Sequence, residues 1–150
     1  MSFEKTAHPS RIKIFVSAHK PASFPDCASI LPIQVGAANV QAAGKPLFED
    51  TLHDNVGDNI SQKNPMYCEL TAQYWAWKNA DANYYGFCHY RRYFDFSDTP
   101  HRQNSYGEIM DAAITPEAIA EYGIDDDSIA KAVEGWDVIT TPMNNVREFD

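Results

Sequence analysis

Residues 12–17, Ile-Lys-Ile-Phe-Val-Ser, restrict the fold more than any other segment of the chain. The run is mostly β-branched or aromatic, it is short for a helix, and His19-Lys20-Pro21 ends it. Short apolar runs of this composition are typical of buried strands. We therefore predict that the folded part of the chain begins with a buried strand.

The clearest predicted helix covers residues 66–79. Its apolar residues recur at spacings of four and three, which is the period of one helix face. They are Leu70, Tyr74 and Trp77. Asn64 suits the N-cap position and Pro65 suits the first helical turn. The pattern predicts an amphipathic helix in the middle of the chain.

Further elements follow this helix. Residues 84–90 and 136–142 have the composition of strands, and residues 118–122 and 127–134 that of short helices. Thr115 and Pro116 supply an N-cap and a first-turn proline for the first short helix. The second short helix is predicted to begin at Asp127-Ser128. Strands that alternate with helices in this way favour parallel pairing.

The predicted fold is therefore α/β, with a mostly parallel sheet and flanking helices. Residues 22–56 are interrupted by proline and glycine and are predicted to be mainly loop, with a short strand possible at 30–35. We expect a flexible tail over residues 1–11 and one domain over residues 12–150.

The composition of the chain argues against a nucleic-acid partner and against a membrane-spanning segment. Twelve Lys and Arg against 21 Asp and Glu give a net charge of −9, which disfavours binding to a nucleic-acid backbone. No run approaches the roughly 20 apolar residues of a membrane helix, and the first residues do not resemble a signal peptide. We expect Cys27, Cys68 and Cys88 to be free, buried thiols, because they are odd in number and form no Cys-x-x-Cys pair. We expect a cytoplasmic protein, at most peripheral at the inner face of a membrane.

The candidate site residues follow from the fold class. Ligands of open α/β sheets bind beyond the carboxyl ends of the strands. Three groups fall there: residues 17–20 (Ser17, Ala18, His19 and Lys20) after the first strand, residues 89–98 after the middle strand, and residues 140–142 after the last. His19 and His89 could also be core or strand-end histidines without a ligand.

Asp58 and Asn59 precede a predicted helix, where free backbone amides favour an anion. Plain capping explains them better on position alone.

Arg91 and Arg92 stand out in an acidic chain because adjacent arginines at a strand end require an anionic partner. That partner is either a ligand phosphate or carboxylate, or the nearby Asp95 and Asp98. Alternation along a continuing strand would place His89 and Arg91 on one face and Arg92 on the other. Composition leaves both kinds of partner open.

Asp95 and Asp98 could supply oxygen ligands to Mn²⁺ or Mg²⁺. Their spacing differs by one residue from the Asp-x-Asp of many nucleotide-sugar transferases. A solvated acidic loop explains this pair better.

Several blocks of the sequence, in order, resemble the DUF4422 family of bacterial capsular and exopolysaccharide glycosyltransferases. The blocks are residues 12–21 (IKIFVSAHKP), 33–37 (IQVGA), 57–65 (GDNISQKNP), 67–71 (YCELT), 74–79 (YWAWKN), 85–86 and 89–94 (HYRRYF). The resemblance extends from about Arg11 to the end of the chain.

This resemblance implies a GT-A-like fold that holds a nucleotide sugar, UDP-linked and in some members UDP-galactofuranose. By the same resemblance Ser17, Ala18 and His19 would line the nucleotide pocket. Asp58 and Asn59 would contribute to the donor site, and residues 89–92 would lie by the diphosphate. The acceptor would be a surface polysaccharide or its lipid-linked precursor.

Family members are longer than this chain, so we expect it to be the N-terminal, donor-binding part of a longer domain. The sequence identifies no catalytic base. A non-catalytic module that keeps only nucleotide-sugar binding is the alternative. A serine hydrolase is disfavoured because no Gly-x-Ser-x-Gly elbow is present.

Overall fold

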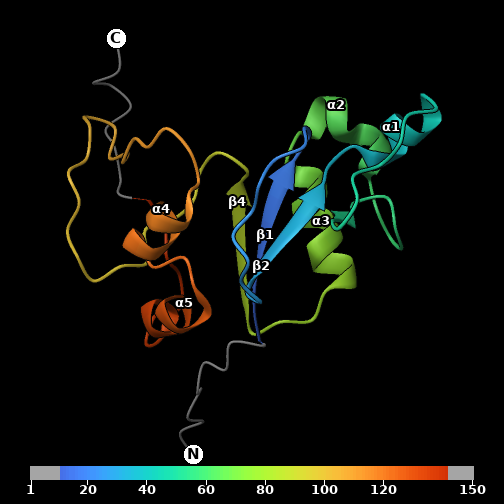
Figure 1. The fold of residues 1–150 in the computed structure, drawn as a ribbon. Helices are drawn as coiled ribbons and strands as arrows, with labels where there is room; N and C mark the ends of the chain where they lie inside the picture. Colours follow the sequence, from blue (N-terminus) through green and yellow to red (C-terminus); the bar gives the residue numbers. More distant parts are fainter. Residues whose placement is uncertain (1–10, 142–150) are drawn as a thin grey trace, which may run out of the picture.

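The computed structural model describes residues 11–141 and is built around a four-stranded sheet (Figure 1). The strands are β1 (Ile12–Ala18), β2 (Ile30–Gln34), β3 (Leu52–His53) and β4 (Tyr84–His89). Their order is β3-β2-β1-β4, and every pair is parallel. The predicted α/β class with a parallel sheet is therefore confirmed.

The helices lie in two layers, one on each face of the sheet (Figure 1). One layer holds α1 (Ala37–Ala42), α2 (Asn64–Tyr67) and α3 (Leu70–Asn79). The other holds α4 (Pro116–Glu121) and α5 (Asp126–Val133). Within residues 11–141, no helix is long and apolar enough to span a membrane.

Strand β1 is buried on both faces because it lies in the middle of the sheet. Its residues Ile12, Ile14 and Val16 pack with Ile129 and Val133 of α5. Phe15 points to the opposite face and joins a second core. That second core also contains Ile33, Val35, Ala72 and Ala76. The apolar run seen in the sequence is thus shared between two cores, one on each side of the sheet.

Helix α3 buries a different face from the predicted one. Thr71, Ala72 and Ala76 are fully buried, whereas Leu70 is 52% and Trp77 69% exposed. The small alanines let the helix approach Phe15 and the sheet closely, so the large side chains point outward.

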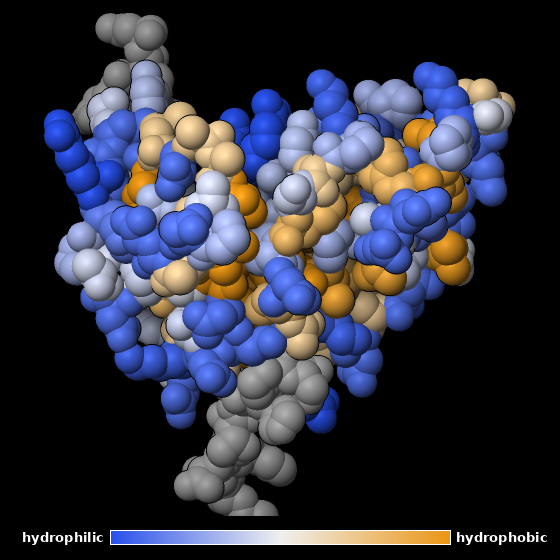
Figure 2. Space-filling view, viewed as in Figure 1, coloured by the Kyte–Doolittle hydropathy of each residue, from blue (hydrophilic) through white to orange (hydrophobic). Residues whose placement is uncertain are grey.

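Hydrophilic side chains cover most of the face of the molecule shown in Figure 2, with apolar ones scattered among them.

The predicted helix 66–79 is divided in two by Cys68, whose φ of 47° and ψ of −128° interrupt the helix. Asn64 is not the N-cap but lies inside α2. Its Nδ2 donates to the carbonyl of Cys68 at 2.8 Å, which holds the break in place. Cys68 is exposed rather than buried as predicted.

Residues 22–56 contain more structure than predicted. The possible strand at 30–35 is confirmed as β2, but α1 and β3 were missed. Helix α1 begins after Gly36, and its first amides donate to the buried carboxylate of Asp54. Because this cap lies 18 residues along the chain from Gly36, no local pattern could reveal it.

The two late helices are confirmed, with one shifted start. The Thr115 side chain caps α4 by accepting from the amide of Ala118, as predicted. Helix α5 begins at Asp126 instead of Asp127, because the Asp125 carboxylate caps it by accepting from the amide of Ser128.

The predicted strand at residues 136–142 is wrong over 136–141, and Pro142 lies outside the described residues. Trp136 and Val138 are exposed, and no described strand pairs with this segment. β-branched composition alone does not make a strand, since a strand needs a neighbour for its backbone hydrogen bonds. The predicted tail also lies outside the described residues, except for Arg11.

Candidate functional site

The carboxyl ends of β1 and β4 lie side by side. Ser17 and His89 are partners in the parallel register, and the amide of Tyr90 donates to the Ser17 carbonyl at 3.0 Å. His19 follows β1, and its ring centre lies 6.0 Å from that of His89 and 5.4 Å from that of Tyr90. Two of the three predicted groups therefore meet at this edge. Residues 140–141 follow no strand.

Three of the residues predicted after β1 differ in accessibility. Ser17 and Ala18 are 2% and 0% exposed, and the Ala18 carbonyl accepts from the amide of Val35. His19 is exposed. A ligand at this edge would thus meet the His19 ring more readily than the side chain of Ala18.

The chain turns sharply after β4, so strand alternation does not continue. The amide of Arg92 donates to the His89 carbonyl at 2.8 Å, which closes a turn over residues 89–92. The amide of Arg91 donates to Nδ1 of His89 at 3.3 Å. The prediction that His89 and Arg91 share one strand face is wrong, because β4 ends at His89.

Arg91 and Arg92 are both exposed at this turn. Neither lies within 4.0 Å of a carboxylate in the part of the chain that the structure describes. Asp95 instead accepts from Ser97 and contacts His101, and Asp98 pairs with Lys131. The two arginines therefore keep their charge available to an anion from outside this chain segment.

The ring of His89 favours its neutral form. Burial lowers its pKa below the usual 6.5; the Glu69 carboxylate opposes this, and Arg91, His19 and Arg92 lower it further. Since the Arg91 amide donates to Nδ1, the neutral ring carries its proton on Nε2. Nε2 faces the Glu69 carboxylate, 3.8 Å from its Oε1.

A hollow of about 190 Å³ opens beside His89. Its lining residues come from β1, β4 and the start of α3 with its N-cap: Ser17, Glu69, Gln73, Phe87, Cys88 and His89. Burial raises the pKa of the Cys88 thiol to about 11, so this group stays protonated. Glu69 and Gln73 were missed from the sequence. The available signal was topological, because a helix that connects parallel strands begins at their carboxyl edge.

Asp58 lies elsewhere, against the C-terminal half of α3, while the Asn59 side chain bonds to the Gly57 carbonyl and the Ser61 amide. The amide of Asp58 donates to the Asn79 side chain, and its carboxylate accepts from the Tyr74 hydroxyl at 3.1 Å. Asn79 is ten residues beyond Glu69, or about 15 Å along a helix at about 1.5 Å per residue. The structure thus does not bring Asp58 beside His89.

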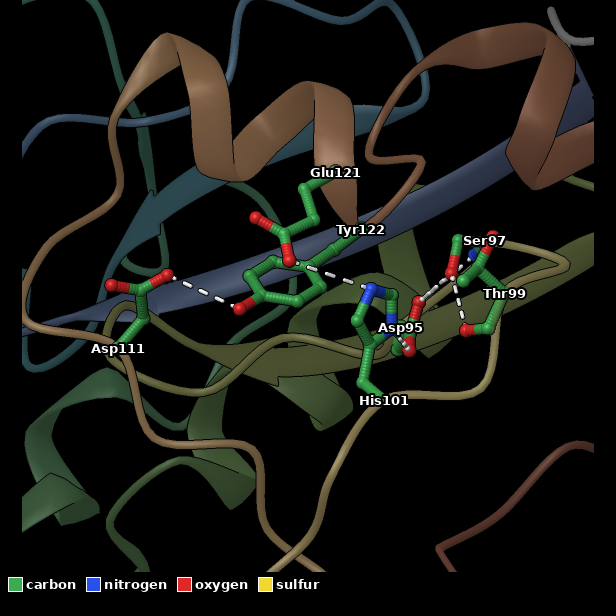
Figure 3. Close-up of polar contacts among 7 residues, drawn as sticks. All are labelled: Asp95, Ser97, Thr99, His101, Asp111, Glu121 and Tyr122. Carbon is green, nitrogen blue, oxygen red and sulfur yellow. Dashed lines mark hydrogen bonds and ion pairs between the residues drawn. The ribbon is translucent and has the colours of Figure 1, made fainter.

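Asp95 and Asp98 turn to different partners. Figure 3 shows Asp95 between Ser97 and His101, with Glu121 on the other side of the His101 ring. Nδ1 of His101 lies 2.8 Å from Asp95, and Nε2 lies 3.6 Å from Glu121. Among residues 11–141, no three His, Cys, Asp or Glu side chains gather into a metal-binding group. In this structure the two carboxylates therefore have separate protein partners, and the metal site stays a prediction.

The chain is similar to one solved structure, the apo form of WbbM, described as a bifunctional glycosyltransferase. The TM-score is 0.75 at 41% sequence identity, over 83% of this chain and 21% of that chain. This chain thus spans about a fifth of the length of that protein.

A search of curated protein sequences finds no match. The family model of DUF4422, a domain of unknown function, matches residues 13–149, which is most of the sequence. The chain therefore belongs to the DUF4422 family.

Proposed function

We propose that this chain is the donor-binding part of a glycosyltransferase and that the diphosphate of a nucleotide sugar binds at the carboxyl ends of β1 and β4. The observation behind the proposal is the pair Arg91 and Arg92, exposed and without a carboxylate partner among residues 11–141. The similarity to a glycosyltransferase at 41% identity supports the same class of activity.

The chemistry of this edge suits a diphosphate. Guanidinium groups bind phosphate oxygens with two hydrogen bonds, and they keep their charge at every physiological pH. In glycosyl transfer, the bond between the anomeric carbon and a diphosphate oxygen breaks, while that carbon bonds to an acceptor hydroxyl that loses its proton. The arginines would stabilise the negative charge that develops on the departing diphosphate.

The finer assignment is a UDP-linked donor, with UDP-galactofuranose as one candidate, and an acceptor that is a surface polysaccharide or its lipid-linked precursor. The protein itself is proposed to act in the cytoplasm, at most peripheral at the inner face of a membrane. Ser17, Ala18 and His19 are proposed to lie by the nucleotide. Asp58 and Asn59 remain a weaker part of this proposal, because Asp58 lies against the other end of α3 and the Asn59 side chain bonds to Gly57 and Ser61.

Isothermal titration with UDP, UDP-galactose and UDP-galactofuranose tests the donor site. Arg91→Ala and Arg92→Ala should each weaken binding by about ten- to a hundredfold, since a hydrogen bond to a charged group contributes about 1.5–3 kcal/mol. Arg11→Ala is the matched control, because Arg11 is also exposed but precedes β1 at the opposite edge of the sheet. If the control loses as much affinity as the two variants, the binding site lies elsewhere.

A divalent ion is a separate hypothesis. Repeating the titrations with Mn²⁺ and with a chelator tests it, and Asp95→Asn and Asp98→Asn test the two carboxylates. Affinity that is independent of the ion would reject a metal-bridged diphosphate.

The alternative is a module that binds the nucleotide sugar without transferring it. It is favoured because residues 11–141 reveal no group placed as a catalytic base. Donor hydrolysis or sugar transfer by the 150-residue chain would reject this alternative.

A further inference from the structure

The hollow beside His89 contains a hydrogen-bond donor and an acceptor that face each other without a direct bond. Nε2 of His89 and Oε1 of Glu69 are 3.8 Å apart, beyond the usual hydrogen-bond distance. In the neutral ring of His89 the proton lies on Nε2, because Nδ1 accepts from the Arg91 amide. Glu69 in its charged form only accepts. A gap of this width separates two groups that one small polar group could join.

A hydroxyl group fits this gap. Its oxygen can lie about 2.8 Å from both Nε2 and Oε1, accept from the ring and donate to the carboxylate. An ammonium group could not accept from Nε2, and a phosphate oxygen would be repelled by Glu69. Of the polar groups in a nucleotide sugar, the geometry selects a hydroxyl.

Gln73, which lines the same hollow, also favours a hydroxyl ligand. Gln73 lies one helical turn after Glu69 on α3 and lines the same hollow. Its amide both donates and accepts, as hydroxyl recognition requires. The Glu69 side chain is 50% exposed and that of His89 is 16% exposed, so the pair is open to a ligand from solvent on the Glu69 side.

We propose that Glu69 and His89 form a subsite for a hydroxyl of the nucleotide sugar, with Gln73 as an additional hydrogen-bonding group. This inference rests on the proposed function, because it assigns part of the same ligand. It adds Glu69, the N-cap of α3, and Gln73 of α3 to a site otherwise built from strand ends. The hydroxyl belongs either to the ribose or to the transferred sugar, and the same chemistry serves both.

The test is titration of Glu69→Ala and Glu69→Gln with UDP and with UDP-galactose. Glu69→Ala should weaken binding about tenfold. Equal weakening for both ligands would place the ribose hydroxyl in the subsite, and weakening for UDP-galactose alone would place the hydroxyl of the transferred sugar there. Glu69→Gln should lose less, because its carbonyl oxygen still accepts.

Whether Glu69→Ala weakens or strengthens donor binding distinguishes a hydrogen bond to a hydroxyl from simple charge repulsion between Glu69 and the diphosphate. Removing a negative charge near a diphosphate should by itself strengthen binding. Glu134→Ala is the charge-matched control, since Glu134 is an exposed residue at the end of α5 and should leave affinity unchanged. Thermal unfolding of each variant reports whether it still folds.

The outcomes also separate the two proposals. If the wild-type chain binds UDP-galactose and Glu69→Ala binds both ligands as well or better, the hydroxyl subsite is rejected while the donor site stands. If the folded wild-type chain binds neither UDP nor UDP-galactose, the proposed function fails and the subsite fails with it.

Discussion

The carboxylate of Asp54 accepts from the amide of Gly36 at 2.9 Å, although 18 residues separate them in the chain. The same carboxylate accepts from the amide of Ala37 at 3.0 Å and from the hydroxyl of Ser61. Asp54 and Ser61 are both 0% exposed. One buried carboxylate thus joins the start of α1, the end of β3 and the turn before α2.

Asp54→Asn should destabilise the fold by about 3 kcal/mol, because an amide brings two donors to a place where three donors already converge. Urea unfolding measures this change. Asp58→Asn is the control, because Asp58 is exposed and its carboxylate accepts from the Tyr74 hydroxyl. This substitution should lower the free energy of unfolding by less than about 1 kcal/mol. Equal losses would mean that Asp54 does not hold these elements together.

The carboxylate of Asp126 should make the free energy of unfolding depend on pH in the acidic range. Its carboxylate accepts from the amides of Ala28 and Ser29 and from the Ser29 hydroxyl. Burial would raise its pKa, but hydrogen bonds from Ser29, Cys27 and the Ala28 amide outweigh burial, so the pKa lies below 3.8.

Because that pKa is lower in the folded state, the unfolded chain binds more protons near pH 4. The stabilisation from Asp126 is therefore complete above about pH 5 and is lost as the pH falls through the lowered pKa. Asp126→Asn should unfold more easily at neutral pH and show a weaker dependence between pH 5 and 3. Parallel profiles for the variant and the wild type would contradict this role.

Truncation on the buried side of α3, where Phe15 of β1 packs, should cost more stability than truncation of Trp77 on its exposed side. Phe15→Ala removes a fully buried ring that packs on Trp75 and Phe87 and should cost about 3–5 kcal/mol. Trp77→Ala removes an exposed ring that contacts Tyr74 and Lys78 and should cost about 1 kcal/mol. Chemical unfolding of both variants gives the comparison. A larger loss for Trp77 would mean that its face is covered in solution.

The titration of His89 should report on its neighbours. Its pKa is lowered mainly by burial, so NMR should find a midpoint below 6.5. Glu69→Gln should lower that midpoint further, because it removes the carboxylate that favours the charged ring. Arg91→Ala should raise it, because it removes a nearby positive charge. Glu134→Gln serves as the control, and shifts in the opposite directions would contradict the arrangement of this site.

The amino-acid sequence was enough to predict the parts of the fold that depend on local pattern. A run of β-branched residues predicted β1, a tyrosine-rich run predicted β4, and Thr115 predicted the start of α4. The order of these elements predicted a parallel α/β sheet. Because carboxyl ends of parallel strands share one edge, it also predicted that His19 and His89 lie close together.

Tertiary structure decided the rest, because it depends on partners that are distant in the chain. The buried face of α3 was fixed by the room for Ala72 and Ala76 against the sheet, and not by the spacing of its large apolar residues. Residues 136–141 form no strand without a neighbour to pair with. At the site, the sequence singled out His89 and the two arginines. Only the crossover of α3 placed Glu69 beside His89, where a hydrogen-bond donor and an acceptor face each other across a gap.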